Sequence, residues 1–247
     1  MFVPIKKSEL LNKMTTNGLQ VLYRYTRTPH FYAASMTSIQ LTLKNLGQEV
    51  LTDLKIGAKT LSPGMTMHEF SGISSLEPDS VQTVTIGINF NDSTQSARFD
   101  LIASGQVFTV QIQPQIGELI RGVSMPETLF DQEKVKLKGM NEVDATFELP
   151  SALSDVVGIK KKIYEVANVV QVPSALEAGD VAIKFAGRTV ATSSLVLLSL
   201  FTHGTSAKLV VNCDKMVIGD MLVKEIKQAF AVPSVLYVHP RLKDQNR

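Results

Sequence analysis

The strongest constraint on the fold of this chain is a two-residue alternation of apolar and polar side chains between residues 81 and 112. In the segment 84–90, VTIGINF, every second residue is a large apolar one. The same alternation returns in the segments 97–101 and 108–112. Successive side chains of a β-strand point to opposite faces, so a period of two is typical of strands with one buried face. The pattern predicts that this part of the chain is a β-sheet.

Shorter segments of the same kind precede this one. Residues 39–44 alternate and are followed by a turn at 45–47, and residues 54–56 alternate again. A series of short strands without a helical pattern predicts an immunoglobulin-like β-sandwich. We place this sandwich at residues 19–124, after an N-terminal segment at 1–18.

The second half of the chain mixes strand and helix periods. It follows a stretch, 113–127, that contains two prolines and two glycines. Apolar residues at three- and four-residue steps predict amphipathic helices at 156–170 and 218–230. Strands are predicted at 145–149, 181–190, 195–201 and 207–213. We therefore expect an α+β platform at residues 125–232, an antiparallel sheet whose flanking helices cover one face, and a mobile tail at 233–247.

Charge and cysteine content favour a cytoplasmic chain that does not bind nucleic acid. The 25 basic and 23 acidic residues give a net charge of +2, which is too balanced for binding by phosphate neutralisation. A single cysteine, Cys213, rules out an internal disulfide and fits a reducing compartment. The first residues do not form a signal peptide, and the longest apolar run, 194–201, is far shorter than the ~20 residues of a membrane span.

The motifs of enzymes and metal sites are incomplete in this sequence. A zinc-protease helix needs a second histidine four residues after His68, but position 72 is glycine. No glycine-rich phosphate loop is present. Cys213 alternates with Val211 and Leu209, which predicts a buried thiol rather than a nucleophile. We therefore predict a binding module without catalytic residues, metal or cofactor; the alternative is an enzyme whose two carboxyl groups are brought together by the fold.

Long runs of the sequence resemble one family. The run "IGAKTLSPGMTMHEFSGISSLEPDSVQTVTIGINFNDSTQSARFDL" (Ile56–Leu101), then "FTVQIQPQIGELI" (Phe108–Ile120) and "LKGMNE" (Leu137–Glu142), are similar to the C-terminal appendage of the beta subunit of adaptor protein complex 3. The resemblance extends from about residue 19 to residue 230. It implies a sandwich followed by a platform, and a chain that is one piece of a larger subunit with a helical trunk and an acidic, serine-rich hinge.

The resemblance also implies a function. Such an appendage recruits cytosolic accessory proteins through short peptide motifs, during vesicle-mediated transport to lysosomes and lysosome-related organelles. Its complex is cytoplasmic and peripheral on trans-Golgi, endosomal and coated-vesicle membranes, so membrane association is indirect and the other adaptor subunits are partners. The alternative is a regulatory or structural appendage that contacts the hinge or trunk of its own complex.

Three groups of residues are candidate partner-binding sites. Related appendages anchor peptides on a platform tryptophan; this chain has no tryptophan, and Met140, with Asn141 and Glu142, stands near that position. The alternative for Met140 is a core position at a strand end. Lys160 and Lys161, with Lys162, could hold an acidic motif or an anionic membrane surface; the alternative is a solvated helix face. Tyr23 and Tyr25, with Phe31 and Tyr32, could form an aromatic patch; the alternative is the packed face of one strand.

Overall fold

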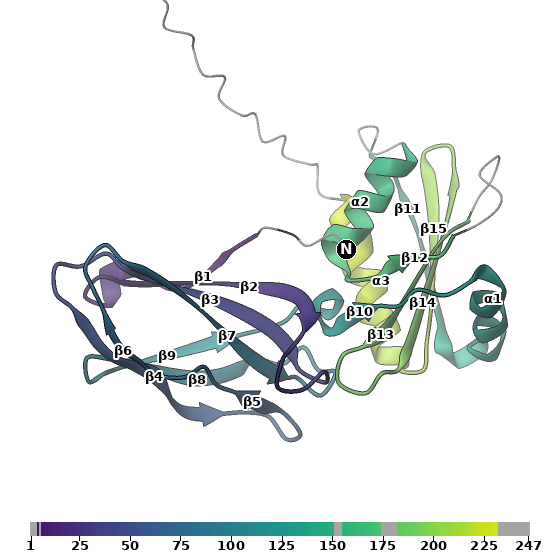
Figure 1. Cartoon of the computed structure of the whole chain (residues 1–247). Helices are drawn as coiled ribbons and strands as arrows, with labels where there is room; N and C mark the ends of the chain where they lie inside the picture. The colour runs from purple at the N-terminus through teal and green to yellow at the C-terminus, as the bar shows by residue number, and fades with distance from the viewer. Residues whose placement is uncertain (1–3, 5, 151–154, 174–181, 232–247) are drawn as a thin grey trace, which may run out of the picture.

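The structure is a computed structural model of the chain, and it describes all residues except 1–3, 5, 151–154, 174–181 and 232–247. Two parts lie side by side: an elongated pair of sheets, formed by the first half of the chain, and a sheet with helices, formed by the second half (Figure 1). This arrangement confirms the predicted fold class, a β-sandwich followed by an antiparallel-sheet platform with helices. The tail predicted at 233–247 lies outside the described residues.

The first part is a sandwich of two antiparallel sheets. The first sheet contains, in spatial order, β1 (Ser8–Leu11), β2 (Leu19–Pro29), β3 (Thr37–Asn45), β7 (Val81–Asn89) and β5 (Thr66–His68). The second contains β6 (Ile73–Leu76), β4 (Leu51–Thr60), β8 (Ala97–Ala103) and β9 (Gln106–Ile112). A short 3-10 turn, η1 (Lys13–Thr15), connects β1 to β2. The expected N-terminal segment 1–18 thus supplies an edge strand of the first sheet.

The alternating residues that predicted the strands form the core of the sandwich. In β7, Ile86 and Ile88 are fully buried, and Ile86 lies opposite the equally buried Ile39 of β3. Phe99 and Leu101 contribute the same kind of buried face from β8. Each such side chain stabilises the fold by about 1.5–3 kcal/mol relative to an exposed one. The period of two therefore sets which face of each sheet is inside.

The second part is an antiparallel sheet with helices on both faces. Its strands are, in order, β10 (Ile120–Gly122), β13 (Ala182–Thr189), β14 (Leu195–His203), β15 (Ser206–Cys213) and β11 (Glu142–Glu148), with β12 (Val170–Gln171) paired to β13. The helices are α1 (Glu127–Lys136), α2 (Val156–Val166) and α3 (Met216–Ala231), and the short turns are η2 (Ile116–Leu119) and η3 (Gly139–Asn141).

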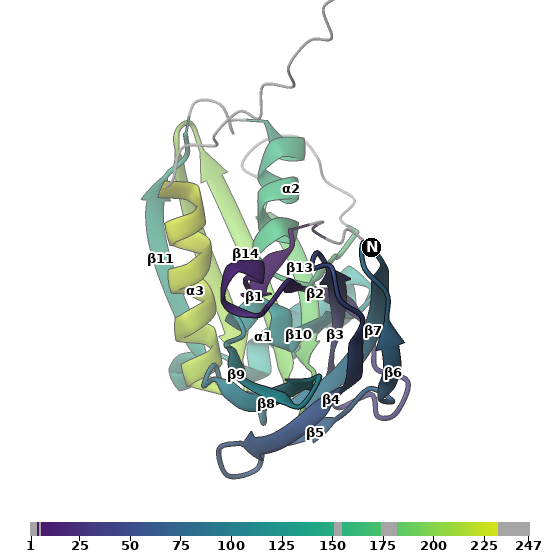
Figure 2. The ribbon, with the colours of Figure 1, turned by 90° about the vertical axis from the view of Figure 1, so that its left-hand side faces the viewer.

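The distribution of the helices corrects one prediction. Leu198 of β14 belongs to the core cluster that contains Ile163 of α2 and Leu222 of α3. Leu197, which points to the other face, belongs to a separate cluster with Phe130 of α1. The helices α2 and α3 cover the face turned toward the sandwich, and α1 covers the opposite face (Figures 1 and 2). The expectation that the helices cover one face was therefore wrong. The helix α1 was not predicted, because Phe130 is its single buried residue and its sequence lacks the apolar spacing of an amphipathic helix.

The helix predicted at 156–170 ends earlier, at Val166, and Val170 lies in β12. A buried arginine of the sandwich contacts the end of this helix. The guanidinium of Arg27 donates to the carbonyl oxygens of Tyr164 and Glu165, at the last turn of α2. The final carbonyl groups of a helix have no partner within the helix, so a cation that donates to them stabilises the terminus there.

Polar contacts join the sandwich to the platform. Arg27 forms an ion pair with Glu118 of η2, with 2.6 Å between Nη2 and Oε1. Asp92, in the loop after β7, forms an ion pair with Lys215 at 2.8 Å and accepts hydrogen bonds from the turn between β13 and β14. The predicted boundary lies after residue 124. The strand β10, which precedes that residue, is hydrogen-bonded to β13 of the platform.

Candidate functional site

An open groove lies on the face of the platform that is turned away from the sandwich. Its volume is about 530 Å³, and α1, β14 and β15 supply most of its walls. Its lining residues are Asp131, Lys134, Val135, Lys138, Glu142, Phe201, Lys208 and Val210. Phe201 is 39% exposed and Val135 is 63% exposed, so apolar surface is accessible beside the charged side chains. The groove can therefore hold a ligand with both apolar and charged groups.

The lysines of this groove differ in their partners. Lys134 donates to the Ser199 hydroxyl at 3.1 Å, and its ammonium lies 5.5 Å from the centre of the Phe201 ring, a cation–π contact. Burial lowers the pKa of Lys134, while the nearby Glu142 carboxylate acts in the opposite direction. Lys208, by contrast, forms an ion pair with Asp144 at 3.1 Å. Among the described residues, Lys134 and Lys138 form no ion pair with a carboxylate.

Met140 is close in the sequence to residues of this groove and is not a core residue. Its side chain is 84% exposed, which excludes the alternative of a core position. Met140 lies in η3, between the groove residues Lys138 and Glu142. The buried Asn212 holds this segment, because its amide donates to the Leu137 carbonyl at 3.0 Å and to the Glu142 carboxylate at 2.9 Å.

The candidate lysines of α2 belong to another surface. Lys161 is exposed, Lys160 is partly buried, and Lys162 lies 3.7 Å from Glu165 of the same helix. Because α2 packs on the face of the sheet opposite to α1, these lysines do not line the platform groove. Consecutive residues also point about 100° apart around a helix, so the three ammonium groups do not form a single cluster.

The tyrosines of β2 pack against each other. The rings of Tyr23 and Tyr25 are 6.0 Å apart and nearly perpendicular, and the Tyr25 hydroxyl donates to the Gln113 carbonyl at 3.4 Å. Both line a hollow of about 170 Å³ between the sandwich and α2. Burial raises the pKa of Tyr25 far above its usual value, with the neighbouring Tyr23 as a further cause.

The other two aromatic residues have different neighbours. The ring centres of Phe31 and His68 are 5.1 Å apart, and the Tyr32 ring stacks on His68 at 4.2 Å. The four aromatic residues therefore do not form one patch.

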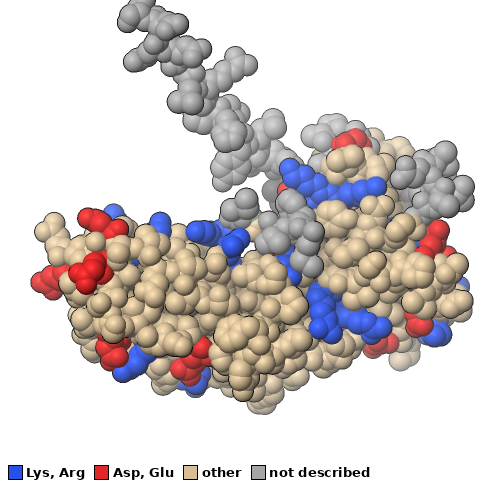
Figure 3. Space-filling view, viewed as in Figure 1, with Lys and Arg blue, Asp and Glu red and all other residues tan. Residues whose placement is uncertain are grey.

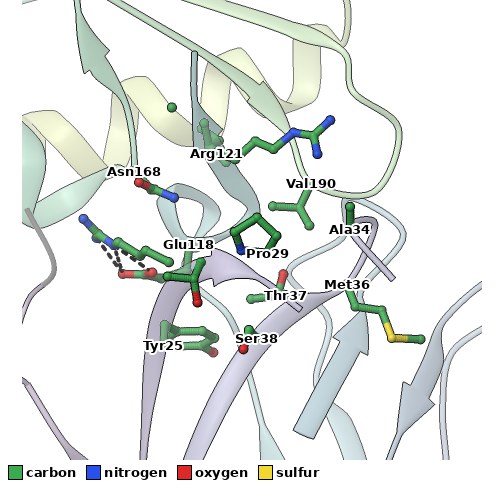
Figure 4. A pocket seen from close by; sticks show the side chains of 14 residues that line it. Tyr25, Pro29, Ala34, Met36, Thr37, Ser38, Glu118, Arg121, Asn168 and Val190 are labelled. Carbon is green, nitrogen blue, oxygen red and sulfur yellow. Dashed lines mark hydrogen bonds and ion pairs between the residues drawn. The ribbon is translucent and has the colours of Figure 1, made fainter. Parts of the chain in front are cut away.

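A cavity at the junction of the two parts was not predicted from the sequence. It has a volume of about 120 Å³, and Figure 4 shows Pro29, Thr37, Ala34 and Val190 around it. Its residues come from β2, the loop before β3, the segment around β10 and the turn after β13. The cavity could not be predicted from the sequence, because these segments approach each other only in the folded chain.

The single cysteine lies in the hydrophobic core. Cys213 is buried, and burial raises the pKa of its thiol to about 11, so the thiolate is scarce at neutral pH. In the part of the chain that the structure describes, no group of three or more His, Cys, Asp or Glu side chains has the arrangement of a metal site. Within that same part, none of the helices is long and apolar enough to span a bilayer.

The chain thus combines a β-sandwich with an α+β platform that has an open groove on one face. Two family models match consecutive parts of the chain. The model for the C-terminal part of the clathrin-adaptor complex-3 beta-1 subunit matches residues 1–95, and the model described as "AP-3 complex subunit beta-1, C-terminal domain" matches residues 117–230.

Proteins with similar sequences are named as beta subunits of the same complex. The chain is 40% identical to AP-3 complex subunit beta-1 of Mus musculus and 41% identical to that of Homo sapiens, each over 228 residues, or 92% of this chain and 20% of the relative. It is 38% identical to AP-3 complex subunit beta-2 of Mus musculus over 226 residues, or 91% of this chain and 21% of the relative. The chain spans about a fifth of the length of these curated relatives.

The chain therefore belongs to the family of C-terminal appendage domains of AP-3 complex beta subunits. This confirms the resemblance inferred from the sequence. The family consists of adaptor-complex subunits that act in vesicle transport and are not enzymes, so the prediction of a non-enzymatic module is confirmed as well.

Proposed function

We propose that this appendage recruits accessory proteins by binding short peptide segments in the platform groove. The observation that carries the proposal is the combination of accessible apolar surface with two lysines, Lys134 and Lys138, that have no carboxylate partner among the described residues. Met140 is exposed in η3, which connects the groove residues Lys138 and Glu142. An apolar anchor beside unpaired charges is the usual composition of a peptide-binding surface.

Weak binding is suited to this role. A disordered segment loses conformational freedom when it binds, so one small groove holds it weakly and reversibly. Many appendages on one coat would then act together, and their combined avidity would exceed the affinity of a single site. The rigid core of the sandwich and platform serves as the scaffold for this surface.

The proposed setting follows from the family. The appendage would act in the cytoplasm as part of an AP-3-type complex, with the other adaptor subunits as partners and with trafficking accessory proteins as ligands. The complex would be peripheral on trans-Golgi, endosomal and coated-vesicle membranes and would serve transport to lysosomes and related organelles. Contact of this chain with the membrane would then be indirect.

The experiment is a selection from a displayed library of disordered peptides, followed by calorimetric measurement of the enriched sequences. Wild-type protein is compared with Met140→Asp, which places a charge on the apolar rim. The matched control is Met14→Asp, because Met14 is 83% exposed on η1 of the sandwich. We expect micromolar peptides whose affinity falls about tenfold or more in Met140→Asp and is unchanged in Met14→Asp.

Other outcomes would lead to different conclusions. Equal binding by all three proteins would place the recruiting surface elsewhere and reject the groove. If no library peptide binds, but hinge segments of AP-3 beta relatives do, the appendage would act as a regulatory element that contacts its own complex. This second function is the alternative to recruitment.

A further inference from the structure

Two arginines stand opposite each other on neighbouring strands of the platform sheet. Arg121 of β10 pairs in register with Arg188 of β13, and Arg188 pairs with Leu195 of β14. Leu195 and Ala186 belong to the cluster packed against α1, and Ala186 lies two residues before Arg188, so both arginine side chains lie on the α1 face of the sheet. In the space-filling view, basic side chains gather over this region of β10 and β13 (Figure 3).

Both guanidinium groups donate to one residue, Ser193, in the turn between β13 and β14. Arg121 donates from Nη2 to the Ser193 hydroxyl at 2.7 Å, and Arg188 donates from Nη1 to the Ser193 carbonyl at 2.8 Å. The turn is fixed by its own hydrogen bonds, because the Ser193 N–H donates to the Thr189 carbonyl at 3.0 Å. The two guanidinium groups are therefore held close to each other and to a hydroxyl group.

The positive charge of this pair is not balanced by the described residues. Like charges opposite each other on paired strands repel, yet neither Arg121 nor Arg188 forms an ion pair with a described carboxylate. Asp214 accepts instead from the Leu195 N–H at 3.1 Å, and Asp92 has another ion-pair partner. Each guanidinium has five N–H donors, of which the contact with Ser193 uses one. Both arginines are partly exposed, so a ligand can reach the remaining donors.

The charge and the donors of this pair match a phosphate monoester better than a carboxylate. A phosphate monoester has a charge of about −1.5 to −2 at neutral pH and three acceptor oxygens, whereas a carboxylate has a single charge and two oxygens. The planar guanidinium fork donates two parallel hydrogen bonds to phosphate. The Ser193 hydroxyl, which accepts from Arg121, also has a proton to donate.

We propose that Arg121, Arg188 and Ser193 form a binding site for a phosphoserine or phosphothreonine of a partner peptide. The two guanidinium groups contact the phosphate from two sides of the pair, and the Ser193 hydroxyl donates to it. Arginine clusters of this kind recognise phosphorylated peptide segments, whereas a membrane surface or a nucleic acid is held by many more cationic contacts. The site shares no residue with the platform groove, so it is independent of the proposed function.

The probe is phosphoserine with an acetyl group on its nitrogen and a methylamide on its carboxyl group. Its binding to the full chain is followed by two-dimensional NMR, beside glutamate and serine capped in the same way. We expect saturable shifts at residues 187–195 and at the arginine side-chain N–H groups, with a millimolar dissociation constant, as is usual for a ligand of this size. Capped glutamate should bind at least about fivefold more weakly, and capped serine should cause no saturable shifts.

Variants test the role of each arginine. Arg121→Gln and Arg188→Gln should each weaken capped phosphoserine at least about fivefold, because each removes a charge-assisted contact. Arg121→Lys keeps the charge but loses the fork, so it should also bind more weakly, by about threefold. The control is Arg98→Gln, which removes the same charge from an exposed position of β8 and should bind as wild type does. Spectra of the free variants show whether each is folded.

Four results would overturn the proposal. They are the absence of saturable shifts at about 20 mM capped phosphoserine, equal binding of capped glutamate, equal weakening by Arg98→Gln, and flotation with phosphoinositide vesicles by a protein that does not bind capped phosphoserine. The last result would assign the arginines to a membrane surface. Met140→Asp, which tests the platform groove, should bind capped phosphoserine normally, so failure of one site is distinguishable from failure of the other.

Discussion

Arg27 places a positive charge in the interior of the molecule, where its side chain is 1% exposed. Glu118, with a side chain that is 9% exposed, is its ion-pair partner, and two carbonyl groups of α2 accept its remaining hydrogen bonds. Removing both charges from water is costly, so the pair is a weak source of stability by itself. Removing one member, however, leaves the other buried and uncompensated.

Replacement of Arg27 should therefore be severe. We expect Arg27→Ala to lower the free energy of unfolding by about 3–5 kcal/mol, measured by urea denaturation. The control is Lys55→Ala, which removes an ion pair with Asp53 whose side chains are 48% and 63% exposed. This control should cost less than about 1 kcal/mol. Similar losses in the two variants would show that burial does not determine the strength of the Arg27 contact.

Glu225 of α3 makes stability depend on pH. Its carboxylate accepts a hydrogen bond from the Ile116 backbone N–H at 3.1 Å. Burial raises the pKa of Glu225 above its ordinary value of 4.5, although the backbone hydrogen bonds oppose this shift. A carboxyl group with a raised pKa stabilises the fold fully below its unfolded pKa, and this contribution is lost as pH rises through the folded value.

The variant Glu225→Gln removes this titration. The melting temperature of wild type minus that of the variant should decrease as pH rises from about 4 to about 7, and this can be measured by differential scanning calorimetry. At neutral pH the variant should be at least as stable as wild type, because an amide oxygen can also accept from Ile116. A difference that increases with pH would contradict the raised pKa.

At the scale of single elements, the strands and helices that could be predicted from the sequence are the ones whose buried side chains recur with a clear period. The strands around Ile86 and Phe99 and the helix α3 have such a pattern. The helix α1 was missed, because a helix that buries only Phe130 resembles a polar loop. The end of α2 was misplaced because Val170, whose spacing continues the helical pattern, lies in β12 and pairs with Ala186 of β13.

The candidate sites were less accessible to prediction than the elements. Met140 could be selected from the resemblance, but the segment around it is held by Asn212, which is far along the chain. The junction cavity combines residues near 29, 120 and 190, which no local pattern connects. Local periodicity reports how each element is buried, whereas a site depends on which elements meet.

The contact of η2 with α2 gives a prediction at this scale. A Cβ atom added to Gly117 would lie 1.9 Å from the Val166 carbonyl oxygen, a backbone atom that cannot move aside alone. Gly117→Ala should therefore lower the free energy of unfolding by about 3 kcal/mol. At Gly72, an added Cβ would meet its nearest atom at 3.7 Å, so Gly72→Ala should change the unfolding free energy by less than about 1 kcal/mol. Denaturation curves of both variants test the comparison.

For the whole molecule, the question is whether sandwich and platform unfold as one unit. Domains within a chain usually move relative to each other unless their interface is extensive or well packed. Here the buried Arg27–Glu118 pair connects β2 to η2 and α2, and Asp92 connects the sandwich to Lys215 and to the turn after β13. These contacts predict a single cooperative unfolding transition.

Asp92 offers the sharpest test of this cooperativity. Its side chain is 2% exposed, and it accepts hydrogen bonds from Thr189 and the Ala191 N–H besides its ion pair with Lys215. None of these partners is in the sandwich, so Asp92→Ala removes this connection while leaving the Arg27–Glu118 pair and each core intact. We expect wild type to show equal calorimetric and van't Hoff enthalpies, and Asp92→Ala to show two separate transitions or a van't Hoff enthalpy well below the calorimetric one.

The control for Asp92→Ala is Asp144→Ala, which removes an exposed ion pair with Lys208 inside the platform sheet. It should leave a single transition, with a loss of less than about 1 kcal/mol. If Asp92→Ala also unfolds in one step at a lower temperature, the two parts are joined mainly by the packing around Arg27 and η2.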